Sequence, residues 1–325
     1  MLRKKTVFIL GAGASAPYKF PTADGLKKQI INESSSLLSS FNDAGNKIFV
    51  RYLDKKPIYY EDFIEGYNKA KTISIDLYLN INPHLADFGK MAIAVCLNKA
   101  ELAYGNEGSN SIFKNVDMTD WLEYLFNNFI INGITNLEHL NDYEPNITFI
   151  TFNYERSLEY FLWTTLSNHF SLLSYEDKFK LYKKFKIFHI YGDLGDYDDV
   201  IKGRNGANKL GGIDSLYVLN RISKNIKTIY ERKEAQDNSN IKTELQTAKN
   251  IFFMGYGFGK ENNAMLDFFR PKLDLKHIYS TNVDFSTNEI VRFNETMPGA
   301  YIQRTGISFA EKGTKCLNLI KEWLK

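Results

Sequence analysis

The sequence is poor in the residues from which metal sites and disulfide frameworks are built. Its 325 residues include only five histidines and two cysteines, Cys96 and Cys316, which lie far apart. Two distant cysteines form neither a CxxC pair nor the four-cysteine set of a structural zinc site. We therefore expect no metal and no disulfide framework.

An excess of one charge and long apolar runs are also missing. The 41 basic residues are nearly balanced by 38 acidic ones, for a net charge of +3. Nucleic-acid binding usually requires a concentrated basic face, which this balance does not indicate. No apolar run approaches the ~18 residues that span a bilayer. Residues 1–17 have the basic and apolar order of a secretory signal, but the apolar core is too short and glycines interrupt it. We expect a cytoplasmic protein that contacts neither membrane nor nucleic acid directly.

Aromatic residues, in contrast, are abundant. They make up 14% of the chain, with 24 Phe and 20 Tyr, and hydrophobic residues in total make up 44%. This composition is typical of a globular protein, and the chain is long enough to bury a full core. Because so many aromatic side chains are difficult to bury in one domain, we also expect a homo-oligomer.

Short β-forming runs alternate with helical stretches along much of the chain. The predicted strands are 6–10, 147–152, 186–191, 250–254 and 277–281, and the clearest helices are 24–38, 120–131, 156–170 and 175–185. This alternation predicts an α/β fold with a Rossmann-like, doubly wound parallel sheet. We expect a single unit in which residues 1–38 and 146–325 form the core. Residues 39–145 give mostly helical signals and are predicted to be a helical insertion or small domain.

Two polar segments, 202–212 and 231–244, interrupt the second half of the chain. Their Gly, Asn and charged residues are typical of solvent-exposed connections. A mobile lid over a functional site is the alternative, because long loops often carry function.

The first predicted strand ends in a glycine turn, Gly11-Ala12-Gly13-Ala14-Ser15. Glycines allow a backbone to approach a pyrophosphate closely, and a following helix offers free N–H groups. The pattern lacks the third glycine of the dinucleotide-binding fingerprint, since Ala16 stands there. A simple tight turn is therefore the alternative interpretation.

Three later strands also end in residues suited to a site. Asn153 follows the strand at 147–152, and its alternative role is to cap the next helix. His189 and Tyr191 end the strand at 186–191, and strand alternation predicts that they share one face. Gly255 and Gly257 follow the strand at 250–254, where an ordinary turn is the alternative. Ligands of open α/β sheets bind at these carboxyl ends.

Taken together, these segments resemble the motifs of sirtuin-like domains, in the same order. Residues 11–15 resemble their GAG-x-S turn, with Pro21 following, and residues 151–155 resemble their T-x-N-[YI]-[DE] pattern. Residues 189–192 resemble their strand that ends in His-Gly, and residues 255–257 resemble Gly-Tyr-Gly. The resemblance covers about half of the chain and implies a Rossmann-like fold that binds NAD.

The chain departs from deacetylating sirtuins in ways that imply a particular subgroup. It lacks their four zinc cysteines and the Phe and Arg that follow their proline, and Tyr191 stands where they have the histidine. These features look more like the zinc-free bacterial effectors of antiphage defence, which destroy NAD. The resemblance thus implies an NAD+ glycohydrolase that is latent until activated.

This reaction assigns a role to each motif. Asn153 is expected to position water and ribose, because an amide both donates and accepts hydrogen bonds. His189 is the preferred base, with Tyr191 as a supporting or alternative group. The resemblance places the pyrophosphate at Gly11, Ala12, Gly13 and Ser15, the adenosine half near Gly255 and Gly257, and the adenosine ribose near Thr281 and Asn282.

Two other functions remain open at this point. A non-catalytic sensor of NAD or ADP-ribose would use the glycines and Asn153 but would not need His189. A zinc-free, NAD-dependent protein deacylase would need an acyl-lysine groove that the sequence does not identify. For an effector or a sensor, we expect a separate partner protein or a trigger that acts on the helical insertion.

Overall fold

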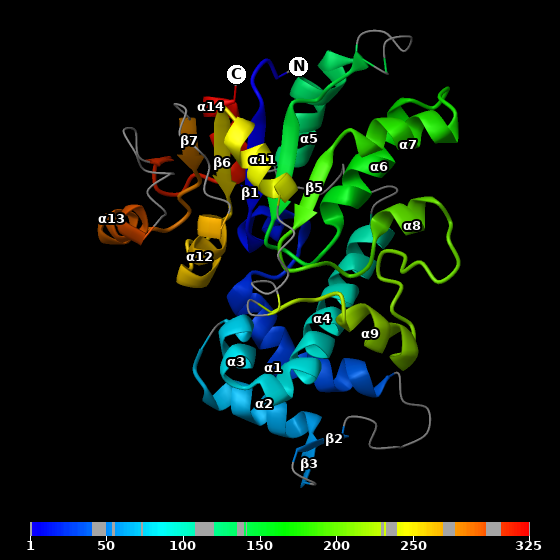
Figure 1. The fold of residues 1–325 in the computed structure, drawn as a ribbon, viewed down its shortest axis with the longest axis vertical. Coiled ribbons are helices and arrows are strands. Elements are labelled where there is room, and N and C mark those ends of the chain that lie inside the picture. Colours follow the sequence, from blue (N-terminus) through cyan, green and yellow to red (C-terminus); the bar gives the residue numbers. More distant parts are fainter. Residues whose placement is uncertain are drawn as a thin grey trace.

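The computed structural model describes residues 2–40, 50–53, 56–72, 74–107, 120–134, 140, 142–228, 231, 239–268, 277–296 and 307–324. Within them, six parallel strands form one sheet in the order β5-β4-β1-β6-β7-β8 (Figure 1). The strands are β1 (Thr6–Leu10), β4 (Ile147–Thr151), β5 (Lys186–His189), β6 (Asn250–Met254), β7 (His277–Ser280) and β8 (Ser308–Phe309). This order corresponds to the 3-2-1-4-5-6 arrangement of dinucleotide-binding sheets. The predicted α/β, Rossmann-like fold is confirmed.

Helices on both faces of this sheet account for most of the remaining core. They are α5 (Trp121–Leu125), α6 (Ser157–His169), α7 (Tyr175–Lys183), α8 (Tyr197–Ile201), α11 (Ser239–Thr247), α12 (Lys260–Phe268), α13 (Thr287–Thr296) and α14 (Cys316–Trp323). The predicted helix at 120–131 is divided, because α5 continues as a π-helical turn at Phe126–Ile130.

A second group of helices, which we call the helical body, lies beyond the carboxyl ends of the strands (Figure 1). It contains α1 (Ala23–Ser39), α2 (Tyr60–Lys69), α3 (Ile75–Ile81), α4 (Ala86–Glu107) and α9 (Leu216–Ser223), with a small hairpin of β2 (Val50–Leu53) and β3 (Lys56–Tyr59). Helix α1 packs along α2 and α4, and α9 also packs on α4. The helical body therefore includes elements from before and after the predicted insertion.

The central strand β1 is covered on both faces of the sheet. All five of its residues are buried, which is typical of a parallel strand covered on both faces. Val7 and Ile9 face one hydrophobic cluster, and Phe8 faces the other. The Phe8 ring stacks on Phe149 of β4 and Phe252 of β6, with centroids 5.5 and 5.4 Å apart. Much of the aromatic content thus fills the core.

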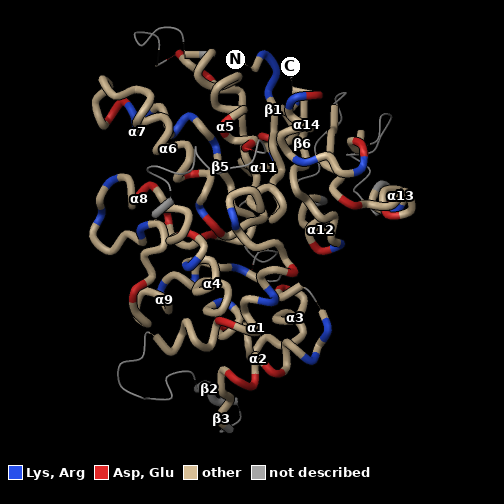
Figure 2. The backbone as a smooth tube through the Cα atoms, turned by 180° about the vertical axis from the view of Figure 1, so that it is seen from behind, with Lys and Arg blue, Asp and Glu red and all other residues tan. Residues whose placement is uncertain are grey.

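Charged residues of both signs are spread over the described chain (Figure 2). Figure 2 shows that its basic and acidic residues are interspersed and do not gather on one side. Among the helices that the structure describes, none combines the length and the apolar character required to cross a bilayer.

Candidate functional site

The sequence-predicted residues meet at the carboxyl edge of the sheet. Leu10 at the end of β1 is in register with Thr151 of β4 and with Met254 of β6, and Thr151 is in register with His189 of β5. The turns that follow these strands therefore lie at the same level. The sheet order reverses between β1 and β6, and this switch point is where open α/β sheets bind ligands.

The glycine turn after β1 packs directly against the turn after β6. The N–H of Gly11 donates to the Met254 carbonyl at 3.0 Å, and the N–H of Gly13 donates to the Gly255 carbonyl at 3.1 Å. A Cβ at Gly13 would lie 2.8 Å from the Cα of Gly255, whose φ of +58° is in the left-handed region. The first role of Gly11, Gly13 and Gly255 is thus to let two backbones approach each other.

Helix α5 holds this turn from one side. The indole N–H of Trp121 donates to the Ala14 carbonyl at 2.9 Å, and the Tyr18 hydroxyl donates to Asp120 at 2.7 Å. All four residues are buried. Helix α5 therefore supports the glycine turn through Ala14, while Ala12 and Gly13 are half-buried.

Gly257 differs from the other glycines of the site. It is exposed, and a Cβ built on it would meet no atom within 4 Å. The space beside Gly257 is therefore open to a ligand, whereas the Cβ positions of Gly11 and Gly13 are filled by backbone.

Two glycine substitutions should separate folding from ligand binding. Gly13→Val is expected to lower the melting temperature strongly, because its side chain must displace the backbone of Gly255. Gly257→Val is expected to melt within about 2 °C of the wild type, since exposed substitutions cost little. For NAD, the ligand expected from the sequence, it should also lose most of the rise in melting temperature that binding produces. Thermal denaturation with and without NAD measures both effects. A Gly13→Val protein as stable as the wild type would contradict the packing argument.

Asn153 joins the glycine turn to the end of β4. Its amide nitrogen lies within hydrogen-bond distance of three oxygens: the Gly11 carbonyl at 3.2 Å, Ser15 Oγ at 3.0 Å and Glu155 Oε1 at 3.4 Å. The alternative role as a helix cap does not apply: the N-cap of α6 is Arg156, and Glu155 Oε2 accepts from the N–H of Ser157 in the first turn. Asn153 is therefore directed toward the predicted site.

Glu155 and Ser15 complete this group, which we call the Ser15–Asn153–Glu155 cluster. The Ser15 hydroxyl donates to Glu155 Oε1 at 2.5 Å, and all three residues are buried. Burial raises the pKa of the Glu155 carboxyl, and the hydrogen bonds from Ser15 and Ser157 offset this only in part. A carboxylate with a raised pKa in a polar cluster is typical of functional sites.

His189 lies beside this cluster but is bonded through both ring nitrogens. Nδ1 is 2.8 Å from the Asn153 carbonyl, and Nε2 is 2.6 Å from Glu159 Oε1 on α6. Burial acts to lower the pKa of His189, but the Glu159 carboxylate outweighs it and the pKa rises to about 10. An imidazolium has no free lone pair. This arrangement does not supply the base that the sequence prediction assigns to His189.

Tyr191 points elsewhere, so the predicted shared face with His189 is wrong. Strand β5 ends at His189, and the chain turns through Gly192, which has a φ of +76°. The Tyr191 ring packs on Phe152 with centroids 5.6 Å apart, and its hydroxyl donates to Asn262 of α12 at 2.7 Å. Strand alternation does not extend past the last paired residue.

Thr281 and Asn282, which follow β7, are buried and bonded within the protein. The N–H of Gly255 donates to the Thr281 hydroxyl at 3.0 Å. The Asn282 amide donates to the Ala310 carbonyl at 3.2 Å and accepts from the N–H of Phe285 at 3.0 Å. Both side chains thus hold neighbouring turns in place.

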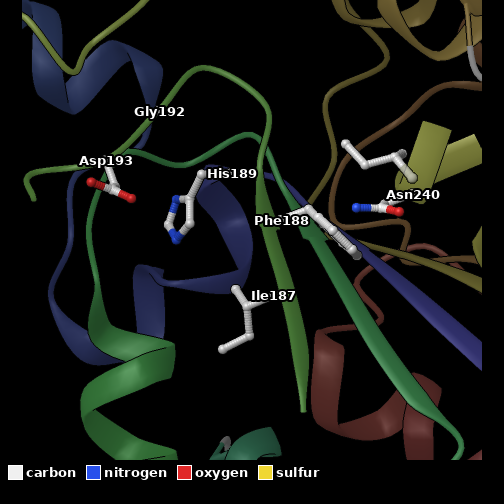
Figure 3. A pocket seen from close by; sticks show the side chains of 7 residues that line it. Ile187, Phe188, His189, Gly192, Asp193 and Asn240 are labelled. Atoms are coloured by element: carbon white, nitrogen blue, oxygen red, sulfur yellow. The ribbon is translucent and has the colours of Figure 1, made fainter. Parts of the chain in front are cut away.

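A pocket of about 270 Å³ lies between β5 and α11. Figure 3 shows His189 and Asp193 on one side of the strand and Phe188 with Asn240 on the other. The residues that line the pocket are Ile187, Phe188, His189, Gly192, Asp193, Asn240 and Ile241. The pocket therefore adjoins His189 and does not include the glycine turn.

The helical body contacts the site through a carboxylate. The Tyr154 hydroxyl, next to Asn153 in the chain, donates to Asp76 of α3 at 2.9 Å. Burial raises the pKa of Asp76 to about 6; the Tyr154 hydrogen bond opposes this, and the Glu261 carboxylate of α12 adds to it. Asp76 is thus a titratable link between the helical body and the loop that carries Asn153.

This raised pKa predicts a pH-dependent effect of Asp76→Asn. An unfolded aspartate titrates near ~4, so the folded wild type loses stability as pH rises from there to about 6. Asparagine keeps an acceptor for Tyr154 but does not ionise. The variant should therefore gain on the order of 1–2 kcal/mol over the wild type between about pH 4 and pH 7. Denaturation at both pH values measures this, and a pH-independent difference would contradict it.

A buried ion pair also connects the helical body to the site. Arg156, which follows Glu155, pairs with Glu101 of α4 at 2.6 Å, and both side chains are almost fully buried. The guanidinium also donates to the carbonyls of Gly195, Asn208 and Lys209. The second half of the polar segment 202–212 is thus attached to this pair, while residues 202–206 are exposed.

Sequence reasoning missed four carboxylate and guanidinium residues of this region: Glu101, Glu155, Arg156 and Glu159. Glu155 and Arg156 follow Asn153 by two and three positions, so their closeness in sequence was a usable signal. Glu101 and Glu159 lie within helical stretches and gave no signal, because their partners are distant in sequence.

Metal-ligating residues do not gather in the part of the chain that the structure describes. No group of three or more His, Cys, Asp or Glu side chains there is placed to hold a metal ion. Cys96 and Cys316 are both buried as free thiols, and burial raises the pKa of each to about 12.

No model of a known protein family matches this chain, and no curated protein matches it.

Proposed function

We propose that this protein is a sirtuin-like NAD+ glycohydrolase, which cleaves NAD to nicotinamide and ADP-ribose. The observation that supports this most is the Ser15–Asn153–Glu155 cluster, which bridges the glycine turn and the end of β4. It lies at the carboxyl edge of a sheet with the strand order of dinucleotide-binding proteins.

The chemistry of the reaction suits this cluster. Cleavage of the nicotinamide–ribose bond passes through an oxocarbenium-like state, as in glycoside hydrolysis, and nicotinamide leaves without protonation. The protein must hold the ribose, exclude bulk water and orient one water molecule. Asn153 and Ser15 offer donors and acceptors for the ribose and the water, and Glu155 offers a carboxylate for the positive charge that develops.

The proposed placement of NAD follows the sirtuin-like resemblance and the open space beside Gly257. The pyrophosphate would lie along the glycine turn with Ser15, and the adenosine half would extend past Gly255 toward the open side of Gly257. Thr281 and Asn282 would act by holding these turns, because their side chains already bond within the protein. His189 would act as a fixed cation that holds the Asn153 carbonyl.

In the cell, we propose that NAD cleavage makes the protein a toxic effector of bacterial antiphage defence, as the sirtuin-like resemblance implies. Its activity would be latent until a trigger or a partner protein acts on it. The helical body is the proposed receiving element, because Asp76 and Glu101 connect it to residues 154 and 156 beside the cluster.

A second candidate function, a sensor that binds NAD or ADP-ribose without cleaving it, is favoured by one observation. His189 has both nitrogens bonded and a pKa of about 10, as a residue that only supports a binding loop would have. A sensor requires the glycine turn and Asn153 but no proton acceptor.

Incubation of the purified protein with NAD, followed by chromatography, tests these proposals. Release of nicotinamide and ADP-ribose in equal amounts is the expected result. Because activity can be latent, NAD is also measured in cells that overexpress the protein, with and without phage infection. A rise in melting temperature with NAD but no cleavage in any of these settings would favour the sensor. Neither binding nor cleavage would overturn both.

A further inference from the structure

We infer that Glu155 receives the proton of the attacking water, and that the proton reaches it through the Ser15 hydroxyl. This inference rests on the proposed NAD cleavage and assigns its proton acceptor to a residue other than His189.

Elimination among the nearby groups points to Glu155. His189 is bonded to Asn153 and Glu159 through both ring nitrogens. Glu159 is paired with this imidazolium through Oε1, and among the described residues its buried Oε2 makes no hydrogen bond to the glycine turn or to Asn153. The Tyr191 hydroxyl is turned away toward α12. Asp193 accepts the N–H of Gly195 within its own turn. Glu155 is the carboxylate that is bonded to both the glycine turn and Asn153.

The two printed hydrogen bonds of the Ser15 hydroxyl use its proton and one of its lone pairs. A hydroxyl has one proton and two lone pairs. The proton of Ser15 points to Glu155 Oε1 at 2.5 Å, and the Asn153 amide donates to one lone pair at 3.0 Å. The second lone pair can accept a hydrogen bond from a water molecule. Asn153 and Ser15 together therefore place that water beside the ribose.

The far side of Glu155 is held in a way that suits a proton acceptor. Its Oε2 accepts from the N–H of Ser157 at 2.6 Å, at the beginning of α6. This fixes the carboxylate and leaves Oε1 as the oxygen that faces Ser15. Burial raises the pKa of the Glu155 carboxyl toward the pH at which general-base catalysis is effective.

The step balances in atoms and charge. The water oxygen bonds to the anomeric carbon of the ribose while the bond to nicotinamide breaks, and the bonding electron pair moves onto the nicotinamide nitrogen. One water proton passes to Ser15 Oγ as the Ser15 proton passes to Glu155 Oε1. After nicotinamide and ADP-ribose leave, Glu155 releases the proton to solvent through the same hydroxyl.

The test is the pH dependence of NAD cleavage by the full-length protein and its variants. In the wild type, kcat should fall at low pH as Glu155 becomes protonated. Glu155→Gln can still accept a hydrogen bond from Ser157, but its kcat should be ~10²–10⁴-fold lower. The fall of kcat at low pH, the acidic limb of the profile, should be absent in this variant. Its KM should stay within about threefold, since the loss falls on the chemical step.

Ser15→Ala distinguishes the relay from a direct role of Glu155. The relay predicts a loss of kcat as large as that of Glu155→Gln, and a double variant no worse than either single one. If Glu155 took the proton directly, Ser15→Ala would keep its plateau activity and shift the acidic limb to higher pH, because Ser15 lowers the pKa of Glu155. His189→Asn should keep the acidic limb, whatever its effect on rate.

The acidic limbs of the Glu155→Gln and His189→Asn variants decide whether Glu155 is the proton acceptor. Loss of the limb in Glu155→Gln together with its retention in His189→Asn supports the inference, provided that circular dichroism and the melting temperature show folded variants. An acidic limb that persists in Glu155→Gln, or one that disappears in His189→Asn, overturns the assignment while NAD cleavage stands. A wild-type protein that releases no nicotinamide in any setting overturns the proposed function and this inference together.

Discussion

Asn153→Ala is expected to lower the rate of NAD cleavage by at least ~100-fold, comparable to the loss of one preorganised hydrogen-bond donor in other active sites. The physical reason is that one amide nitrogen is within hydrogen-bond distance of the Gly11 carbonyl, Ser15 and Glu155. Without this amide, the water and the ribose of the proposed complex lose one hydrogen-bonding group and are no longer aligned with each other. Nicotinamide release from purified protein measures the effect.

A matched control exists in the helical body. Asn98 is also a buried asparagine, and its amide exchanges two hydrogen bonds with the backbone of Ile213, at 2.9 and 3.3 Å. Asn98→Ala should cost stability of about 1–3 kcal/mol, because it leaves buried backbone groups unpaired, but should keep kcat within about twofold. Equal losses of activity in Asn98→Ala and Asn153→Ala would mean that both act only through the fold.

The largest effect on stability is expected from Arg156→Met, at about 3–5 kcal/mol, because removal of one partner leaves a buried charge uncompensated. Glu101 is 0% exposed and accepts from Arg156 and from the N–H of Gly211. The variant also removes the guanidinium donor from the carbonyls of Gly195, Asn208 and Lys209, of which the Lys209 carbonyl still accepts from the N–H of Gly212. Urea denaturation at neutral pH measures the loss.

The exposed pair of Arg204 and Asp199 in the same part of the chain provides the control. Their side chains are 60% and 35% exposed and lie 2.6 Å apart. Arg204→Met should cost less than ~1 kcal/mol, because solvent screens an exposed pair. The double variant Arg156→Met with Glu101→Leu should recover part of the loss, since it removes the buried charge as well. If Arg156→Met and Arg204→Met lower the free energy of unfolding equally, burial of the ion pair is not the cause of the loss.

The helical body contacts the loop between β4 and α6 through two of its helices. Glu101 and Asp76 reach residues 156 and 154 from separate helices, so the loop between β4 and α6 is held on both sides of Glu155. A shift of the helical body would therefore act first on this loop. This is the physical basis for proposing that a trigger acts there.

Local sequence pattern determined the inner strands almost residue by residue. β1 and β6 have the predicted bounds, and β4 differs by one residue, because buried parallel strands are continuous apolar runs bounded by glycine or a polar residue. The same pattern determined that Gly11, Asn153 and Gly255 stand at strand ends, and hence at one edge of the sheet. The two-residue strand β8 gave no signal, since it is too short to show alternation.

The tertiary structure alone decided the chemical state of the site residues. The sequence placed a histidine at the end of β5, but Glu159 on α6 bonds its Nε2 and raises its pKa to about 10. It placed glycines after β1, but the turn after β6 is what occupies the space beside them. Arg156 finds Glu101 across 55 positions of the chain. Strand and turn formation depend on neighbours in sequence, whereas protonation and hydrogen bonding depend on burial and on partners that only the folded chain brings together.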